Sequence, residues 1–280
     1  MPEHLPRRRT FPSEGPITID CTLAVATLTV ELGDHVAEVV VELQARDATS
    51  DVADRTSVDL RGSHLAIRGP RPSRWKRSIL EAWLKPYAGL EVRVVAPATS
   101  GVRVAVFDGD VTVHGPSGPI LVAGGRVAVQ ADDVRGAVRL RGGYGRLRIR
   151  EAREAVTARC GACEIDIDHA RAPVTVQCAS GSLRIGVADA VTRLRTGAAG
   201  ATIEAAYADV NLMSGAGSHS IGLPPGQAAR LDIVTGSGRL ISDLPLTSHE
   251  PQRQSITIRA RTGSGDIRLH RATVAARQAS

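Results

Sequence analysis

One short pattern recurs along the C-terminal two-thirds of this 280-residue chain at a fixed interval. The pattern is a turn followed by an alternating strand, and its copies read GYGRLRI, GACEIDI, ASGSLRI, GAAGATI and GAGSHSI. The third residue of each copy marks the turn, and successive marks lie 18 residues apart at Gly145, Cys163, Gly181, Ala199 and Gly217. Looser copies have their marks at Gly109, Gly125, Gly238 and Gly265. A fixed interval of this length is typical of a stacked repeat protein.

Each copy predicts two short strands on either side of the turn, such as 174–178 and 183–187 around Gly181. The second and fourth residues after the mark are apolar in most copies, whereas the first and third are mostly polar. This period of two places one side of each strand inward and the other in water. Glycine at the mark permits a positive φ or a close backbone approach at a tight turn. The pattern therefore predicts an all-β fold, a single-stranded β-solenoid of stacked 18-residue Gly-turn repeats.

The composition indicates a thin interior, because only 2% of residues are aromatic although 42% are hydrophobic. Aromatic side chains normally supply much of the area that a globular core buries. Val, Leu, Ile, Ala and Gly must therefore fill the interior, which suits stacked coils better than a wide sandwich.

The rest of the chain is expected to cover the open ends of the solenoid, since exposed edges invite aggregation. We divide the sequence into a flexible basic tail at 1–16, a β-rich capping region at 17–105 and solenoid repeats at 106–280. Towards the C-terminus the marks spread further apart, and we interpret the extra residues as Pro-containing loops in atypical terminal repeats.

Two segments carry a family resemblance, TGSGRLISDL from Thr235 and IRARTGSGDIRLHR from Ile258. Together with Leu32–Gly33 and the run from Leu90 onward, they make the chain similar to the putative-adhesin-like β-strand-repeat family, also called toast-rack proteins. The resemblance implies a β-solenoid used as a structural or interaction module. It implies no catalytic residues.

Three cysteines near two of the turns, Cys160, Cys163 and Cys178, resemble part of a metal site. Zinc normally takes four Cys or His ligands. Aligned copies place Thr or Ser where Cys160 and Cys178 stand, so we interpret these cysteines as part of a ladder of small residues. A metal site and a redox disulfide are the alternatives, and we expect neither a metal ion nor a cofactor.

Glu164, Asp166 and Asp168 alternate on one outward face, as the acids of carbohydrate-cleaving β-helices do. Their expected neighbours one coil away include Arg146, Arg148 and Arg184. Opposite charges on adjacent rungs form cross-strand pairs, so we interpret the acids as a surface charge ladder, with a glycan or calcium site as the alternative. His219 falls on an inward position and is expected to be structural.

A helical pattern near 74–85 is the exception in an otherwise all-β sequence. It contains Trp75, Lys76, Arg77 and Trp83, and it includes both tryptophans of the chain. We expect it to cover the end of the solenoid, with contact to a partner or to a membrane surface as the alternative.

The charge balance is +6, but the arginines are spread along the whole sequence and aromatic residues are rare. On these grounds we expect no nucleic-acid binding. The segment 1–16 has no apolar stretch of the kind that a secretory signal contains, and no run of 18 apolar residues occurs, so we expect a cytoplasmic protein without a transmembrane segment.

No GxSxG, HExxH or P-loop motif is present. The sequence therefore favours a non-enzymatic scaffold or interaction module with a protein partner. A polysaccharide-acting or glycan-binding β-helix and a surface adhesin are the alternatives. Contact with a polymer or glycan and self-association through the solenoid ends are further expectations.

Overall fold

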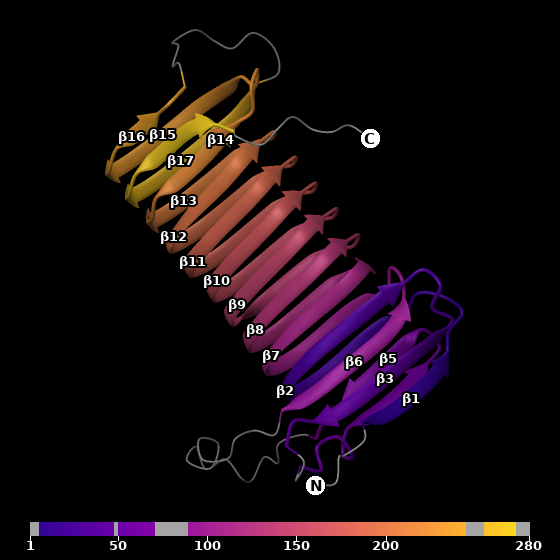
Figure 1. Cartoon of the computed structure of the whole chain (residues 1–280). Coiled ribbons are helices and arrows are strands. Elements are labelled where there is room, and N and C mark those ends of the chain that lie inside the picture. The colour runs from indigo at the N-terminus through magenta and orange to yellow at the C-terminus, as the bar shows by residue number, and fades with distance from the viewer. Residues whose placement is uncertain (1–5, 48–49, 71–88, 245–254, 273–280) are drawn as a thin grey trace, which may run out of the picture. The chain divides into compact units, whose positions relative to one another are not determined.

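The computed structural model describes residues 6–47, 50–70, 89–244 and 255–272. In these residues the regular structure consists of strands, with no helix (Figure 1). The chain divides into two compact units, unit 1 at Met1–Gly136 and unit 2 at Ala137–Ser280. The predicted all-β solenoid is confirmed. The helix expected near 74–85, with Trp75, Lys76, Arg77 and Trp83, lies outside the described residues.

Unit 2 is built from coils that stack in parallel and in register (Figure 1). From β9 to the coil after β12, each pairing joins residues 18 positions apart, for example Val156 with Val174, so the interval read from the sequence is the length of chain in one coil. The first coils are the strands β9 (Val138–Ala152), β10 (Val156–Ala170), β11 (Val174–Ala188) and β12 (Thr192–Ala206). The next coil is split into β13 (Val210–Ala216) and β14 (His219–Leu223).

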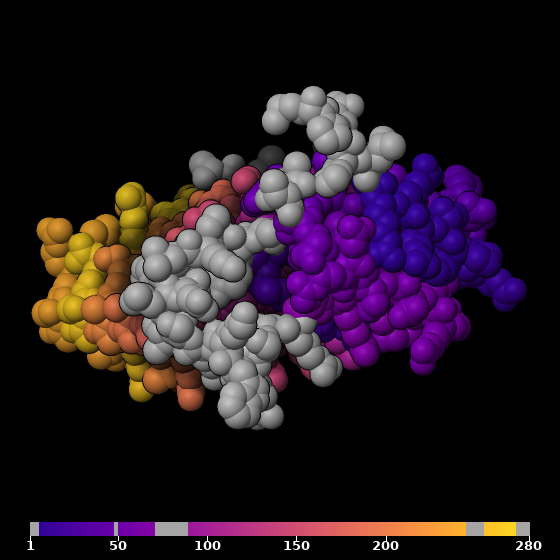
Figure 2. Space-filling view, turned by 90° about the horizontal axis from the view of Figure 1, so that it is seen from below, coloured from indigo at the N-terminus to yellow at the C-terminus, as the bar shows by residue number. Residues whose placement is uncertain are grey.

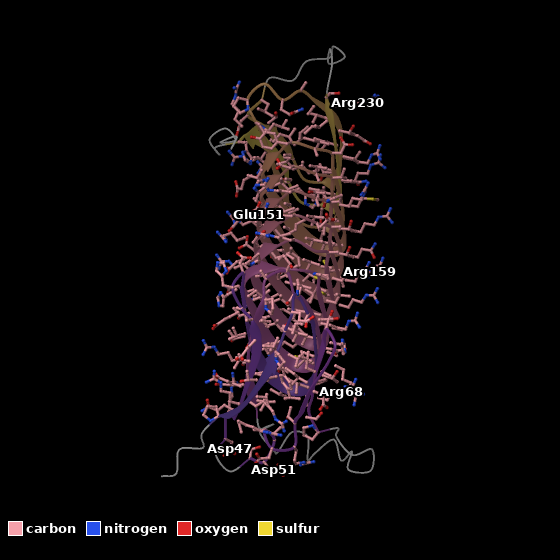
Figure 3. All side chains as sticks on the ribbon, turned by 90° about the vertical axis from the view of Figure 1, so that its right-hand side faces the viewer. Asp47, Asp51, Arg68, Glu151, Arg159 and Arg230 are labelled. Carbon is pink, nitrogen blue, oxygen red and sulfur yellow. The ribbon has the colours of Figure 1, made fainter. Side chains whose placement is uncertain are left out.

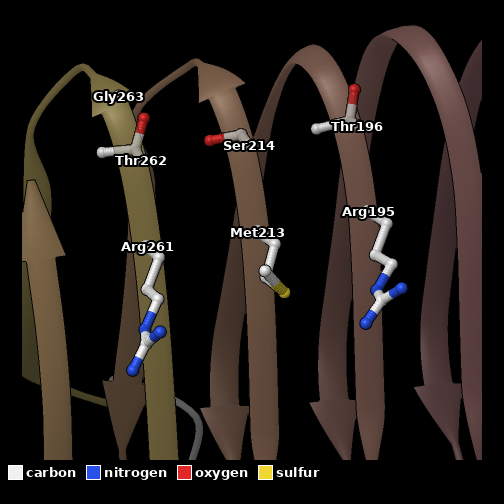
Figure 4. A pocket seen from close by; sticks show the side chains of 7 residues that line it. All are labelled: Arg195, Thr196, Met213, Ser214, Arg261, Thr262 and Gly263. Atoms are coloured by element: carbon white, nitrogen blue, oxygen red, sulfur yellow. The ribbon is translucent and has the colours of Figure 1, made fainter.

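Each of β9 to β12 is one bent strand, not the two short strands that we expected. In β11 the parallel ladder continues from Cys178 through Ser180 and Gly181 to Leu183, so the bend keeps its pairing with the neighbouring coil. The two halves of the strand fold back towards each other at this bend, as the ribbons of Figure 4 show for neighbouring coils. The turn is therefore part of the sheet.

The core of unit 2 lies between the two halves of the coils and is almost entirely aliphatic. Inward residues recur in columns, because a residue and its partner 18 positions later point the same way. Two of these buried columns are Val138, Val156 and Val174, and Ile149, Ile167, Ile185, Ile203 and Ile221. The thin, aromatic-poor interior expected from composition is what the structure has.

Glycine is required at some of the bends. Gly181, Gly217 and Gly265 have φ angles of 135°, 139° and 128°, which L-residues rarely adopt. At Gly181 an added Cβ would also overlap the carbonyl oxygen of Cys163 in the preceding coil. Cys163 and Ala199 occupy the same position in alternate coils, where their side chains are buried.

At the C-terminal end of unit 2, the order of the coils differs from the order of the sequence. The coil of β15 (Ala229–Ser237) and β16 (Leu240–Ser242) was expected to follow β13 and β14 directly. Instead, β17 (Ile256–Ser264) pairs with both β13 and β15, and β18 (Ile267–Arg271) pairs with both β14 and β16. The last coil of the sequence thus lies inside the stack, and the earlier coil forms its end (Figure 1).

The two coils differ in burial. Ile258 and Leu269 in the inner coil are fully buried, whereas Leu240 and Ile241 in the end coil are exposed. The end coil also has a second strand of only three residues, β16. Repeat proteins end in atypical, more polar units because nothing covers the outer face of the last repeat.

In unit 1, the parallel stack consists of β2 (Thr18–Gly33), β7 (Gly101–Ser117) and β8 (Ile120–Val134). The domain boundary expected at residue 105 falls inside β7. Gly109 pairs with Val127 and not with Gly125, because the ladder keeps the interval of 18 residues. The mark that we assigned to Gly125 is therefore corrected to Val127.

The other side of β2 pairs with two strands, β5 (His64–Arg68) and β6 (Leu90–Pro97). Three antiparallel strands extend the sheet from there: β4 (Ser57–Arg61), β3 (Glu38–Ala45) and β1 (Arg7–Pro12). We expected a flexible tail at 1–16, but Arg7–Pro12 pairs with β3 and lies at the surface (Figure 2). Arg7 fixes this strand by donating hydrogen bonds to the carbonyl oxygens of Ala53, Asp54 and Thr56.

Candidate interaction surfaces of unit 2

The three acidic residues singled out in the sequence lie on the face formed by the second halves of the coils. Arg146 Nε donates to Glu164 Oε2 at 2.8 Å, and Arg184 Nη1 donates to Asp166 Oδ1 at 3.0 Å. Arg184 also lies 3.8 Å from Asp168. The acids therefore alternate with arginines from rung to rung, and we call this surface the paired face.

The environment of Glu164 bears on the polysaccharide-cleaving alternative. A catalytic pair of carboxyl groups needs different environments, so that one group holds a proton while the other is ionised. Hydrogen bonds from Tyr144 and Arg146 instead lower the pKa of Glu164, which keeps it ionised. These pairs are exposed, and exposed pairs contribute at most about 1 kcal/mol each.

The opposite face, formed by the first halves of the coils, has a different charge pattern. Two outward columns run across the stack. One contains Arg141, Arg159, Gln177, Arg195, Met213 and Arg261. The other contains Arg139, Thr157, Thr175, Arg193, Asn211 and Arg259. We call the seven arginines of these columns the arginine face.

An open hollow of about 520 Å³ lies on the arginine face (Figure 4). Arg195, Met213 and Arg261 form one row of its lining, and Thr196, Ser214 and Thr262 form a second row beside the bends. Within this first row, Met213 lies between Arg195 and Arg261 and has no charge. The guanidinium groups of the two arginines, which are two coils apart, therefore lie on either side of the hollow.

Sequence reasoning missed the arginine face. We took the arginines to be spread out because they are distant along the chain. Arg141, Arg159 and Arg195 are separated by one and two intervals of 18 residues, and this spacing stacks them in one column. The repeat itself was the signal that could have revealed the face.

The three cysteines of the repeats lie close together at two bends. Cys160 and Cys178 are register partners on β10 and β11, and Cys178 Sγ lies 3.6 Å from Thr196 Oγ1. Hydrogen bonds with the Cys163 thiol and then with the Thr196 hydroxyl lower the pKa of Cys178. In the described part of the chain, no group of three or more His, Cys, Asp or Glu side chains is arranged to hold a metal ion.

Replacing both Cys160 and Cys178 with threonine is expected to change the free energy of unfolding by less than about 1 kcal/mol. Thr196 and Thr262 already occupy the equivalent position in other coils, where their hydroxyls donate to backbone carbonyl oxygens. Thermal unfolding of the double variant and the parent protein measures the difference. Stoichiometric zinc in the purified parent, lost from the variant, would instead support the metal alternative.

His219 points inward and is buried. Its Nε2 lies 2.9 Å from Ser214 Oγ, and its Nδ1 is buried and has no hydrogen-bond partner among the described residues. Burial lowers the pKa of His219 to about 4, so the ring is neutral at neutral pH. Because it has no access to solvent and no acidic partner, this histidine fits a structural position.

The possible interaction surface assigned to Trp75, Lys76, Arg77 and Trp83 lies outside the described residues. The part of the chain that the structure describes contains no helix long and apolar enough to cross a membrane.

Unit 2 is thus a β-solenoid with two flat faces of different charge pattern. No family model matches the sequence, and no curated protein matches it. Among solved structures, the chain is similar to a putative adhesin from Bacteroides fragilis, with 10% identity, a TM-score of 0.31 and coverage of 96% of this chain and 98% of that one.

A putative adhesin from Parabacteroides distasonis gives 11% identity and a TM-score of 0.31, with coverage of 95% of this chain and 97% of that one. A putative cell adhesion protein from Clostridium sporogenes gives 10% identity and a TM-score of 0.26, with coverage of 95% and 100%.

Proposed function

We propose that this protein is a non-enzymatic scaffold that binds a protein partner along a flat face of its stacked coils, and that it acts in the cytoplasm. The observation that carries the proposal is the distribution of the charged side chains of unit 2. They stand at fixed positions of the repeat, in straight columns across the coils, and do not gather around one point.

This distribution suits binding better than catalysis. Catalysis needs a few groups within hydrogen-bond reach of one reacting atom. Columns of side chains repeated at about 4.8 Å per coil present many equal contacts over a long surface. A stable interface between proteins buries on the order of 1,600 Å² in total, which requires an extended surface of this kind.

A photo-crosslinking experiment tests the proposal face by face. A diazirine side chain is placed either at Gln177, on the arginine face, or at Ser182, on the paired face, because both positions are exposed. We expect irradiation of cells to yield a specific protein adduct from at least one of the two positions. A variant that carries the diazirine at Ser182 and lacks residues 161–178, which make up one whole coil, should stay folded and give less adduct.

The enzyme alternative predicts a different outcome. Incubation with polysaccharides would then release new reducing ends, and Asp166→Asn would abolish that release. Such cleavage, with no protein adduct from either position, would contradict the proposal.

A further inference from the structure

The arginine face carries an excess of positive charge that the described residues leave largely unpaired. Asp232 and Asp209 are acids in the same halves of the coils. Asp232 pairs with Arg259 at 2.8 Å and with Arg261 at 3.1 Å, and Asp209 accepts a hydrogen bond from the Thr257 backbone N–H. Within the described residues, the other five arginines form no ion pair within 4.0 Å: Arg139, Arg141, Arg159, Arg193 and Arg195.

The geometry of the face is planar and regular. Neighbouring coils are about 4.8 Å apart, and residues two positions apart along a strand are separated by roughly 6.6 Å. The columns therefore place guanidinium groups over a surface of roughly 24 Å along the stack. Figure 3 shows Arg159 and Arg230 projecting from one side of the stack, with Glu151 on the other side.

The hydroxyl groups beside the columns are already engaged. Thr196 Oγ1 donates to the carbonyl oxygen of Ala179, and Thr262 Oγ1 donates to that of Gly217. Ser214 Oγ lies 2.9 Å from the ring of His219. Among the side chains that line the hollow, the guanidinium groups are therefore the donors left for a ligand, so recognition in the hollow depends mainly on charge.

The side chains of the two columns also argue against single-stranded nucleic acid. Such partners are held by aromatic side chains that stack on the bases, and neither column contains an aromatic residue. A flat array of guanidinium groups is complementary to a flat array of phosphates. Clusters of four to eight basic residues are typical of surfaces that bind anionic lipids.

We propose that the arginine face of unit 2 docks onto an anionic lipid bilayer, where its guanidinium groups bind the phosphates of the headgroups. The attachment is electrostatic and reversible, because the apolar side chains in line with the columns are only Met213 and Val234, the register partner of Arg261 in the end coil. This docking goes beyond the proposed scaffold function, and it would hold the paired face away from the membrane and open to a protein partner.

Vesicle flotation with the full chain tests the docking. Vesicles of phosphatidylcholine alone are compared with vesicles that also contain phosphatidylglycerol. We expect binding only to the anionic vesicles, and we expect it to be lost when salt rises from about 0.1 M to about 0.5 M.

The decisive comparison is between two double variants with the same net charge. Arg159→Gln with Arg195→Gln removes two unpaired arginines from the arginine face, and we expect affinity for anionic vesicles to fall about tenfold or more. Arg148→Gln with Arg150→Gln removes two arginines from the second half of one coil, and we expect less than about a twofold change. Equal losses in both double variants would overturn the proposal.

A gain-of-binding variant provides a second test that does not depend on loss of function. Gln177 lies between Arg159 and Arg195 in the first column. The substitution Gln177→Arg therefore gives three successive coils an arginine at this position. We expect this variant to bind anionic vesicles about fivefold more tightly. Unchanged or weaker binding would count against docking through this face.

The same protein is also tested against duplex DNA and heparin at about 0.15 M salt. Binding to either polymer without binding to anionic vesicles would overturn the bilayer proposal in favour of a polyanionic polymer. If vesicle binding fails but protein adducts from Gln177 or Ser182 persist, the docking is wrong and the scaffold function stands.

Discussion

Gly181→Ala is expected to destabilise the protein by roughly 3–5 kcal/mol. Gly181 has a φ of 135°, and an added Cβ would lie 1.8 Å from the carbonyl oxygen of Cys163. That oxygen belongs to the backbone of the adjacent coil, so it can move only if the parallel ladder moves with it. The strain of the unfavourable φ and the steric overlap both act against the folded state.

Gly145→Ala is the matched control, because Gly145 occupies the same position of the repeat. Its φ is not in the positive range, and the atoms nearest to an added Cβ are the ends of two side chains, Cys160 and Leu140. We expect a loss of about 1–2 kcal/mol there, since these side chains can adjust. Chemical denaturation of both variants measures the two losses in the free energy of unfolding. Equal losses would show that neither the positive φ nor the overlap with Cys163 adds a cost at Gly181.

The sequence predicted the register and the core of the coils well, because both follow from one interval and one alternation. Residues 18 positions apart, such as Ile167 and Ile185, become neighbours in the stack, and apolar residues at every second position become inward columns. The same rule explains why Glu164 is the register partner of Arg146, and Asp166 that of Arg184.

The ends could not be predicted in this way. Pairing with β13 requires only a matching alternation, and both 229–242 and 256–271 provide one. The two segments differ in polarity at one inward position, where the inner coil has Leu269 and the end coil has its register partner Ser242. Burial of the leucine favours the covered position for 256–271. In unit 1, β2 likewise pairs with β7, which lies far along the chain. Such long-range pairing leaves no local signal in the sequence.

The candidate surfaces were predicted in part. The acids of the paired face were found because their residue type suggests chemistry, whereas the arginine face was missed because its members are far apart in sequence. In a solenoid, distance along the chain is a poor measure of distance in space. Charge in a repeat protein is therefore better counted by repeat position than by sequence window.

His219 is expected to make the folded state sensitive to mild acid. Burial lowers its pKa in the folded protein to about 4, whereas an unfolded histidine has a pKa of about 6.5. Below about pH 6.5 the unfolded chain therefore binds a proton that the folded chain excludes. The neutral ring contributes its full stability above that pH, and this contribution is lost as the pH falls towards 4.

The lost contribution is about 3 kcal/mol, from a pKa difference of about 2.5 units at 1.36 kcal/mol each. Replacing His219 with leucine removes the titrating group from a column that already holds Ile267 and Leu183 in other coils. The free energy of unfolding is measured from pH 7 to pH 4 for both proteins. The variant retains all the exposed carboxyl groups that also titrate in this range, so their contribution cancels in the comparison. We expect the parent protein to lose about 3 kcal/mol more than His219→Leu over this interval. Parallel pH profiles would show that the histidine is protonated in the folded state, either by entry of water or through a partner for Nδ1.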